Sequence, residues 1–388
     1  MNSSEPDKAD KNVSKKVITK ENVSDLIMKS ISKNKKSFRN KVEMLPMLNN
    51  TFKSFYSEKE DKMNFLIERI ANVEKGLLEI IKEDEFVNYS MAIGDNFWTV
   101  GVLIPIIGET ITKENTFLYN PKYNSKPIKL DLTELENYSA YGGQVVAVKC
   151  SSTKDQLKVS EMVNVPMLEL FSGLKNNLNL LVAKGPFSDE QIDDFIDEDV
   201  NLIILFGPFR DDLMDFNSFV ELCNNKLKRT TNLMIILVPS QLDHEFGPVY
   251  PQNSKNTNSS RVKCYNNPSM INVNGHIIAL NNFDVIKDMS RGLIEKITKP
   301  NINFYKADRT ERLCRHILLQ KTFLPAFPAS EQIFYSNDFS YKILPSIYIT
   351  TSSCETFNRS VCTVEFINLN KKIYKINYVA STEKYHIE

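Results

Sequence analysis

The sequence lacks the motifs that build the commonest catalytic and nucleotide-binding sites. With 12 glycines and 4 histidines in 388 residues, it contains no Gly-x-x-x-x-Gly-Lys loop and no Gly-x-Ser-x-Gly turn. The first absence excludes a phosphate-cradling loop, and the second excludes the usual serine-hydrolase nucleophile. The six cysteines include no Cys-x-x-Cys pair, so neither a zinc ribbon nor a disulfide framework is favoured. We expect reduced, mostly buried thiols.

Net charge and long apolar runs are also missing. Lys and Arg number 48 together, as do Asp and Glu, so no overall field attracts nucleic acid or anionic lipid. No apolar run approaches the roughly 20 residues of a membrane span. The first 16 residues contain no apolar core of a secretory signal. These patterns predict an intracellular protein with no membrane partner.

The N-terminal part divides into a tail and a helix. Residues 1–45 are rich in Lys, Asn, Ser and Asp, and we expect a disordered basic tail. Within it, the basic stretch at 32–41 is either a nuclear import signal or a solvated segment. Residues 46–87 form a helical segment whose apolar residues recur at three- and four-residue steps. These are Leu66, Ile67, Ile70, Val73, Leu77 and Ile81.

Residues 88–168 carry five short β-rich segments. Five strands in about 80 residues are typical of a small closed barrel, and the order of elements suggests an OB-fold. Thr133 and Glu136 are spaced as a capping box, which predicts a helical turn between the third and fourth strands. OB-folds often stack single-stranded bases on aromatic residues. Trp98 shares its strand with apolar residues, so we expect it in the core, and weak or no direct DNA binding.

Residues 169–388 alternate between strands and helices. The series up to residue 238 follows a βαβαβ order, which right-handed crossovers arrange as a largely parallel sheet. A hairpin turning at Asn274 and Gly275 follows, then helices at 283–297 and 309–322. Three C-terminal strands are expected to complete an antiparallel edge. The predicted fold class is therefore mixed α+β: an N-terminal helix, an OB-fold barrel and an α/β domain.

The α/β domain places polar residues at strand ends, where ligands gather in open sheets. A two-metal phosphoesterase needs carboxylate, imidazole and amide ligands at several such ends. Here the bridging-carboxylate position is a proline, which offers no side-chain ligand, so we predict a degenerate site with no catalytic, cofactor-binding or metal-binding residue. Its loops contain Gly185, Gly207, Pro208, Asp211, Pro239, Ser240, Asp243 and His276.

Some residues near these ends have structural interpretations as well. Asp211 and Asp212 would serve as N-terminal caps of the following helix. His276 follows a tight turn and is expected at a hairpin tip, while His316 lies within a predicted helix as a structural residue.

The same loops are unusually rich in proline and aromatic residues. Rigid aromatic loops suit a protein contact surface, because they supply area at low entropy cost. The alternative is that these rings close the domain's own core. The residues concerned are Phe187, Phe209, Tyr250 and Phe327.

Six segments resemble the B-subunit family of DNA polymerase alpha. They cover roughly residues 63–365 in the family's order. The resemblance implies an OB-fold followed by a calcineurin-like phosphoesterase domain (169–388) that has lost its metal ligands. The segments are "LDLTELENYSAYGGQVVAVK", "VNLIILFGPFRD", "LVPSQLDHEFGPVYPQ", "NPSMINVNGHIIALNNFDVI", "RLCRHILLQKTFLPAFP" and "LPSIYI".

The resemblance implies a non-catalytic nuclear scaffold without a cofactor. Its partner would be the C-terminal region of the polymerase alpha catalytic subunit, and indirectly the primase subunits, during initiation of DNA replication. The region before the barrel is shorter than the family's usual helical domain and linker. The alternatives are a B subunit of polymerase delta or epsilon, or a metal-dependent phosphodiesterase or nuclease. We expect the barrel and the α/β domain to behave as one unit.

Overall fold

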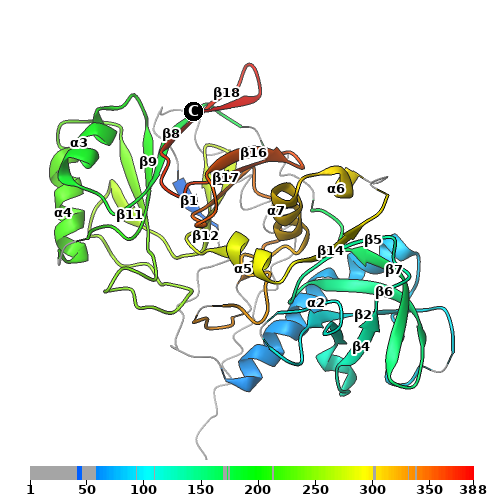
Figure 1. Ribbon diagram of the computed structural model, residues 1–388. Helices are drawn as coiled ribbons and strands as arrows, with labels where there is room; N and C mark the ends of the chain where they lie inside the picture. The colour runs from blue at the N-terminus through cyan, green and yellow to red at the C-terminus, as the bar shows by residue number, and fades with distance from the viewer. Residues whose placement is uncertain are drawn as a thin grey trace, which may run out of the picture.

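The computed structural model describes residues 42–45, 58–92, 94–108, 110–168, 173, 175–211, 214–299, 303–330, 332–336 and 339–388. The fold is mixed α/β, and it comprises a β-barrel beside a sandwich of two larger sheets (Figure 1). The expected basic patch at 32–41 lies outside the described residues. Within them, no helix has both the length and the apolar character required to cross a membrane.

Helix α2 (Lys59–Ile81) begins at a capping box between Glu58 and Asp61. It lies within the predicted helical segment, and its buried stripe includes Phe65, which contacts the rings of Phe327 and Tyr335 at centroid distances of 6.3 and 5.1 Å. The helix therefore packs on residues that come some 250 positions later in the chain, as well as on the barrel.

The barrel consists of β2 (Phe97–Ile104), β3 (Phe117–Tyr119), β4 (Ile128–Asp131), β6 (Val145–Ser152) and β7 (Gln156–Asn164). It closes in the order β2-β3-β4-β7-β6, with β4 and β7 parallel and the other pairs antiparallel. A short 3-10 turn, η2 (Pro121–Tyr123), follows β3. All five strands fall in the predicted β-rich segments. Trp98 is half-buried, and the Lys149 ammonium lies 5.9 Å from its ring centroid.

The helical turn predicted at Thr133 is wrong. The Thr133 amide and hydroxyl both donate to Asp131 Oδ1, at 3.0 and 2.6 Å, so the local hydrogen bonds form a tight turn instead. The next residues form strand β5 (Asn137–Ala140), which pairs with β14 (Ile294–Ile297) in a separate two-stranded sheet. Tertiary pairing with a distant strand decides the structure of this segment.

Two six-stranded sheets form the sandwich. The first has the order β11 (Val262–Cys264), β10 (Met234–Val238), β9 (Leu202–Phe206), β8 (Leu178–Lys184), β18 (Tyr374–Val379) and β19 (Lys384–Ile387). The second has the order β1 (Val42–Met44), β12 (Ser269–Val273), β13 (His276–Asn281), β15 (Ile347–Thr350), β17 (Val364–Asn368) and β16 (Phe357–Val361).

The sheets pack face to face with helices outside them. Along β9, Leu202, Ile204 and Phe206 enter the core between the sheets, whereas Ile203 and Leu205 face the outer helices α3 (Asp189–Asp197) and α4 (Phe216–Leu227). This burial on both faces explains the unbroken apolar run of the strand. Helices α5 (Val285–Arg291) and α7 (Arg309–Leu319) cover the second sheet, and α6 (Asn303–Lys306) precedes α7 (Figure 1).

Three further expectations need correction. The helix predicted to reach residue 297 ends at Arg291, and residues 294–297 form β14 instead. The C-terminal strands do not make one antiparallel edge, since β15 is parallel to both β13 and β17, while β18 joins the other sheet. The tail predicted to be disordered to residue 45 contains β1, which pairs with β12.

The barrel and the sandwich meet at a close junction. Gln320 Oε1 accepts from the Val145 amide at 2.8 Å, and its Nε2 donates to the Val145 carbonyl at 3.0 Å. Gly143 has a φ of +98°, and a Cβ there would lie only 2.3 Å from the Phe327 amide nitrogen. Arg69 of α2 adds a bond from Nη1 to the Pro325 carbonyl at 2.9 Å. Side-chain bonds to the backbone, together with one close backbone approach, therefore hold the barrel against the sandwich.

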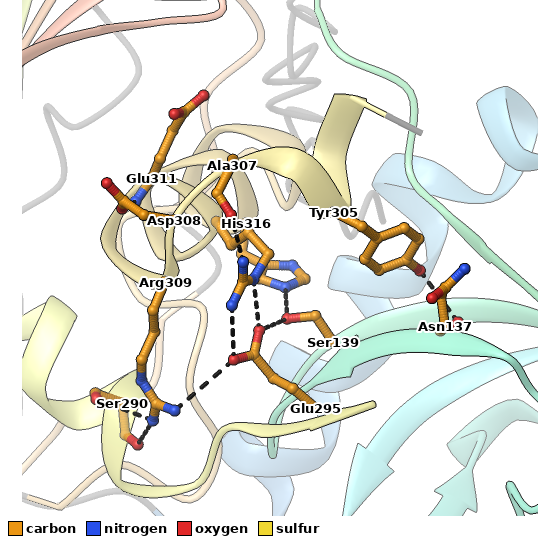
Figure 2. Close-up of polar contacts among 11 residues, drawn as sticks. Asn137, Ser139, Ser290, Glu295, Tyr305, Ala307, Asp308, Arg309, Glu311 and His316 are labelled. Carbon is orange, nitrogen blue, oxygen red and sulfur yellow. Dashed lines mark hydrogen bonds and ion pairs between the residues drawn. The ribbon is translucent and has the colours of Figure 1, made fainter. Parts of the chain in front are cut away.

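A polar cluster on the same junction joins β5, β14 and α7 (Figure 2). Glu295 accepts from Arg312 Nε at 2.7 Å and from Ser139 Oγ at 2.7 Å. Burial alone would raise the pKa of Glu295, but the bonds from Arg312 and Ser139 hold that pKa below its ordinary value. The carboxylate therefore remains charged within the junction.

Candidate functional site

The predicted site loops meet at one edge of the sandwich, around Asn282. This residue directly follows β13, and its Nδ2 donates to the carbonyls of Gly207 at 3.0 Å and Pro239 at 3.1 Å. Its Oδ1 accepts from the Thr351 hydroxyl at 2.6 Å. A single buried side chain thus joins the carboxyl ends of β9 and β10 in one sheet to those of β13 and β15 in the other.

Asp243 makes a second cross-link at this edge. Its Oδ1 accepts from the Phe209 amide at 2.8 Å, and its Oδ2 accepts from the Ser240 amide at 2.7 Å. Burial raises the pKa of Asp243 to about 6, although the two amide donors act in the opposite direction. Both carboxylate oxygens are therefore occupied by main-chain amides.

Two glycines are required by this close packing. A Cβ on Gly207 would lie 2.0 Å from Asp243 Oδ2, and a Cβ on Gly185 would lie 2.0 Å from the Pro208 carbonyl. The structure thus brings together Gly185, Gly207, Pro208, Pro239, Ser240 and Asp243. These residues contact one another closely and largely through main-chain atoms. This arrangement indicates that the loops pack tightly together.

Among the described residues, no group of three His, Cys, Asp or Glu side chains could hold a metal ion. At the strand ends, Pro208 offers no side-chain ligand, and both carboxylate oxygens of Asp243 accept from main-chain amides. The described residues therefore do not fit a two-metal centre.

His276 does not belong to this edge, so its assignment to the predicted strand-end site is wrong. It is the first residue of β13, at the opposite end of the strand from Asn282. Its Nδ1 lies 2.6 Å from the Tyr385 hydroxyl, and its Nε2 lies 2.7 Å from the Asn176 carbonyl. Burial lowers the pKa of His276 to about 4. The histidine instead secures the start of β13 to the C-terminal hairpin.

Asp211 is exposed and does not cap α4. The N-terminal cap is Asp215, whose Oδ1 accepts from the Ser218 amide at 3.0 Å. Asp212 lies outside the described residues. The sequence missed Asn282, for which the only signal was a pair of asparagines directly after a β-rich segment.

Three of the four aromatic residues considered for partner contact are core residues. Phe187 and Phe209 both pack on Phe219, with ring centroids 6.5 and 5.3 Å apart. Tyr250 is fully buried, and its hydroxyl donates to Asn281 Oδ1 at 2.9 Å. Phe327 is partly buried at the junction. For the first three rings, the prediction of a partner contact is wrong, and the alternative of closing the core holds.

The junction cluster of Figure 2 contains serine, histidine and glutamate but does not form a nucleophilic triad. In a triad the histidine lies between the serine and the acid, so that it can take the serine proton. Here Ser139 Oγ donates directly to Glu295 at 2.7 Å and also lies 3.0 Å from His316 Nε2. Burial lowers the pKa of His316 to about 3. The buried arrangement stabilises the junction, and His316 is structural.

Comparison with known proteins places these features in a family. The family model of the DNA polymerase alpha/epsilon B subunit matches residues 154–359. The chain belongs to this family. The matched region begins just before β7 of the barrel and ends in β16. It includes Asp243, Asn282 and the sandwich side of the junction.

Individual members of the family are distant relatives. The DNA polymerase alpha B subunit of Bos taurus is 28% identical over 270 residues, which cover 59% of this chain and 44% of the relative. The Mus musculus protein of the same name is 25% identical over 274 residues, covering 60% and 45%. That of Schizosaccharomyces pombe is 25% identical over 312 residues, covering 64% and 52%. The chain spans about half the length of these relatives.

A solved structure, that of TT1561 from Thermus thermophilus, covers 54% of this chain and 98% of its own. The TM-score of 0.28 and the identity of 11% are too low to assign a fold from this similarity.

Proposed function

We propose that the chain is a non-catalytic accessory subunit of the DNA polymerase alpha–primase complex. It would bind the C-terminal region of the catalytic subunit, contact primase indirectly, and act in the nucleus during initiation of DNA replication. Membership of the B-subunit family supports this function. The observation that carries it is Asn282, whose amide fills the strand-end edge with bonds to main-chain carbonyls.

The proposed domains follow the same family pattern. We assign residues 46–87 to a helical segment, 88–168 to an OB-fold and 169–388 to an inactive phosphoesterase-like domain. The parallel pairing of β4 with β7, which closes an otherwise antiparallel five-stranded barrel, supports the OB-fold. The two helix-covered sheets support the second assignment.

The loops at the strand ends would serve as a support for partner contacts. Gly185, Gly207, Pro208, Pro239, Ser240 and Asp243 hold the edge closed through main-chain contacts. Leu242 projects from the same edge and is 70% exposed. An exposed leucine on a loop that Asp243 fixes is suited to contact with a partner.

Two alternatives are distinguishable. A B subunit of polymerase delta or epsilon would assemble with a different catalytic subunit, and the relatives named above favour alpha. A metal-dependent phosphodiesterase or nuclease would need ligands that the described strand ends do not supply. The chain has equal numbers of acidic and basic residues. We therefore also propose weak or no direct binding of single-stranded DNA.

Affinity purification of the tagged chain from its source cells tests the function. We expect the polymerase alpha catalytic subunit and both primase subunits among the co-purifying chains. Recovery of a delta or epsilon catalytic subunit would instead select that alternative. Stoichiometric metal together with phosphodiester hydrolysis in Mn²⁺ that persists through repurification would overturn the non-catalytic assignment.

A further inference from the structure

The hairpin turn between β12 and β13 carries the one Asn-Gly pair in the sequence, Asn274–Gly275. Both residues have a left-handed backbone, with φ values of +54° and +92°, as a two-residue turn of type I′ requires. The same pair is chemically reactive. Because glycine has no Cβ, its nitrogen can approach the side-chain amide carbon of the preceding asparagine with little hindrance. The turn therefore combines a role in the fold with a site for amide chemistry.

In the closed turn, hydrogen bonds engage both reacting groups. The nucleophile would be the Gly275 nitrogen, whose N–H donates to Asn272 Oδ1 at 3.0 Å. The group under attack would be the Asn274 amide, whose Nδ2 donates to the Asn177 carbonyl at 3.1 Å. Asn272 and Gly275 are both buried. For the reaction, the N–H must leave its acceptor and the amide must turn away from Asn177, so closure of the turn suppresses the chemistry.

The turn also anchors the segment that precedes β8. The Asn176 amide donates to the Asn274 carbonyl at 3.0 Å, and the Asn176 carbonyl lies 2.7 Å from His276 Nε2. The Ala380 amide donates to Asn177 Oδ1 at 2.9 Å. This segment is thus tied to β13 of the second sheet and to the C-terminal hairpin. Loss of the turn contacts would loosen the start of β8.

We propose that Asn274 is a site of spontaneous deamidation, which the closed turn suppresses and an opened turn permits. In the opened turn, the Gly275 nitrogen attacks Asn274 Cγ, and the Cγ–Nδ2 bond breaks. The amide nitrogen leaves as ammonia, which takes up the proton lost by the Gly275 nitrogen. Water then opens the succinimide ring at either carbonyl carbon, returns a proton to the Gly275 nitrogen and leaves an aspartate or an isoaspartate. Water is the only other reactant, and nothing is oxidised or reduced.

Both products would prevent the turn from closing as before. Each replaces an amide donor that faces the Asn177 carbonyl by a carboxylate, which only accepts hydrogen bonds when it is ionised. Isoaspartate in addition lengthens the main chain by a methylene group, which moves the hydrogen-bonding groups of the turn out of register. Chains in which this turn has opened for long enough to react would thus be marked permanently. The inference does not depend on the proposed function.

The first test follows the reaction in the full chain at neutral pH, by mass spectrometry of the fragment that contains Asn274. The chain unfolded in guanidinium chloride and a synthetic peptide of residues 269–280 give the unprotected rate. We expect the folded chain to react at least about tenfold more slowly than either, because two hydrogen bonds must break first. Equal rates in the folded chain and the peptide would overturn suppression by the fold. An absence of conversion in the unfolded chain would overturn the site itself.

Two variants separate the turn from the rest of the fold. Asn272→Ala removes the acceptor of the Gly275 N–H and should accelerate the reaction about threefold to tenfold. Asn368→Ala removes another buried asparagine of the same sheet, on β17, whose Nδ2 donates to the carbonyls of Cys354 and Glu355. It should leave the rate within about twofold of the wild type. Equal acceleration by both variants would show that global unfolding controls the reaction, and the proposed role of the turn would fail.

The consequence for the fold is tested with Asn274→Asp, which has the sequence of one product. Hydrogen exchange at the Asn176 amide should be about fivefold or more faster in this variant, because the acceptor of that amide lies on the turn. Asn258→Asp makes the same chemical change at another asparagine with a left-handed backbone, on an exposed loop, and should leave that exchange unchanged. Unchanged exchange in Asn274→Asp would contradict the loosening of the start of β8.

Discussion

Asn282 Nδ2 and the Gly207 carbonyl oxygen lie 3.0 Å apart, and this hydrogen bond joins the two sheets of the sandwich at their shared edge. The same nitrogen also donates to the Pro239 carbonyl, so one amide group satisfies acceptors from two neighbouring strands. The buried carbonyls at this edge need hydrogen-bond donors. Asn282 supplies them, which gives this edge a structural role that its sequence alone did not reveal.

Replacing Asn282 by aspartate should be strongly destabilising. The substitution turns the donor that faces two carbonyls into an acceptor, and we expect a loss of about 3 kcal/mol or more in the free energy of unfolding. Asn217→Asp makes the same chemical change on an exposed position of α4 and should cost less than about 0.5 kcal/mol. Urea denaturation of both variants measures the difference. Equal stabilities would show that the edge does not depend on this amide.

Gly143→Ala should loosen the junction between the barrel and the sandwich. The new Cβ would lie 2.3 Å from the Phe327 amide nitrogen, so the two backbones must separate. Gly94→Ala is the matched control, because Gly94 also has a positive φ, of +128°, but has nothing within 4 Å of the added atom. Backbone strain costs about 1–3 kcal/mol at both sites, and the clash adds to it only at Gly143. Limited proteolysis between residues 164 and 175 should accelerate only in the Gly143 variant.

The Glu295–Arg312 pair should behave as a buried ion pair. Glu295→Gln leaves the guanidinium without its charged partner and should cost about 3 kcal/mol, whereas the double variant Glu295→Gln, Arg312→Met should recover part of that loss. The Lys299–Glu136 pair is exposed, and Glu136→Gln should change stability by less than about 1 kcal/mol. Thermal and urea unfolding give these values. The losses of Glu295→Gln and Arg312→Met are also measured separately. A double variant that loses as much stability as the two single variants together would contradict the pairing.

Acid should destabilise the protein through His276. Its pKa is about 4 in the folded chain and about 6.5 when unfolded, so protons bind preferentially to the unfolded state as pH falls through this window. The stability present above pH 6.5 therefore decreases toward pH 4, by up to about 3 kcal/mol for this residue. His276→Asn should flatten the slope of unfolding free energy between pH 7 and 5. A slope that His276→Asn leaves unchanged would contradict this prediction.

The sequence predicted the elements whose signals are local. The apolar runs of β9 and β10, the Asn274–Gly275 turn and the five barrel strands all carry their pattern within a few residues. The errors came where distant contacts decide the structure. Residues 294–297 look helical by periodicity, yet they pair with β5 of the barrel region. Local spacing cannot contain that information.

Only part of the candidate site could be predicted, because local patterns locate some of its residues and distant contacts locate the others. Gly207, Pro208 and Ser240 were correctly located at neighbouring strand ends, because β9 and β10 are consecutive parallel strands. His276 was assigned to the wrong end because β13 belongs to the second sheet, and the sequence does not specify how the two sheets face each other. The burial of Phe187, Phe209 and Tyr250 depends on helices and loops that pack from elsewhere in the chain.

The side chain of Gln320 bonds both the amide and the carbonyl of Val145. It therefore takes the place of a residue on a neighbouring strand. During synthesis on the ribosome, these two bonds of Val145 therefore form only after a residue 175 positions later has been added. Until then the Val145 backbone stays open to water, and the nascent barrel has a section of strand available to other chains. Hydrogen exchange at Val145 should accordingly be fast in a chain that stops before residue 309 and slow in the full chain. The barrel precedes the sandwich in the sequence, yet it is completed only after much of the sandwich has been synthesised.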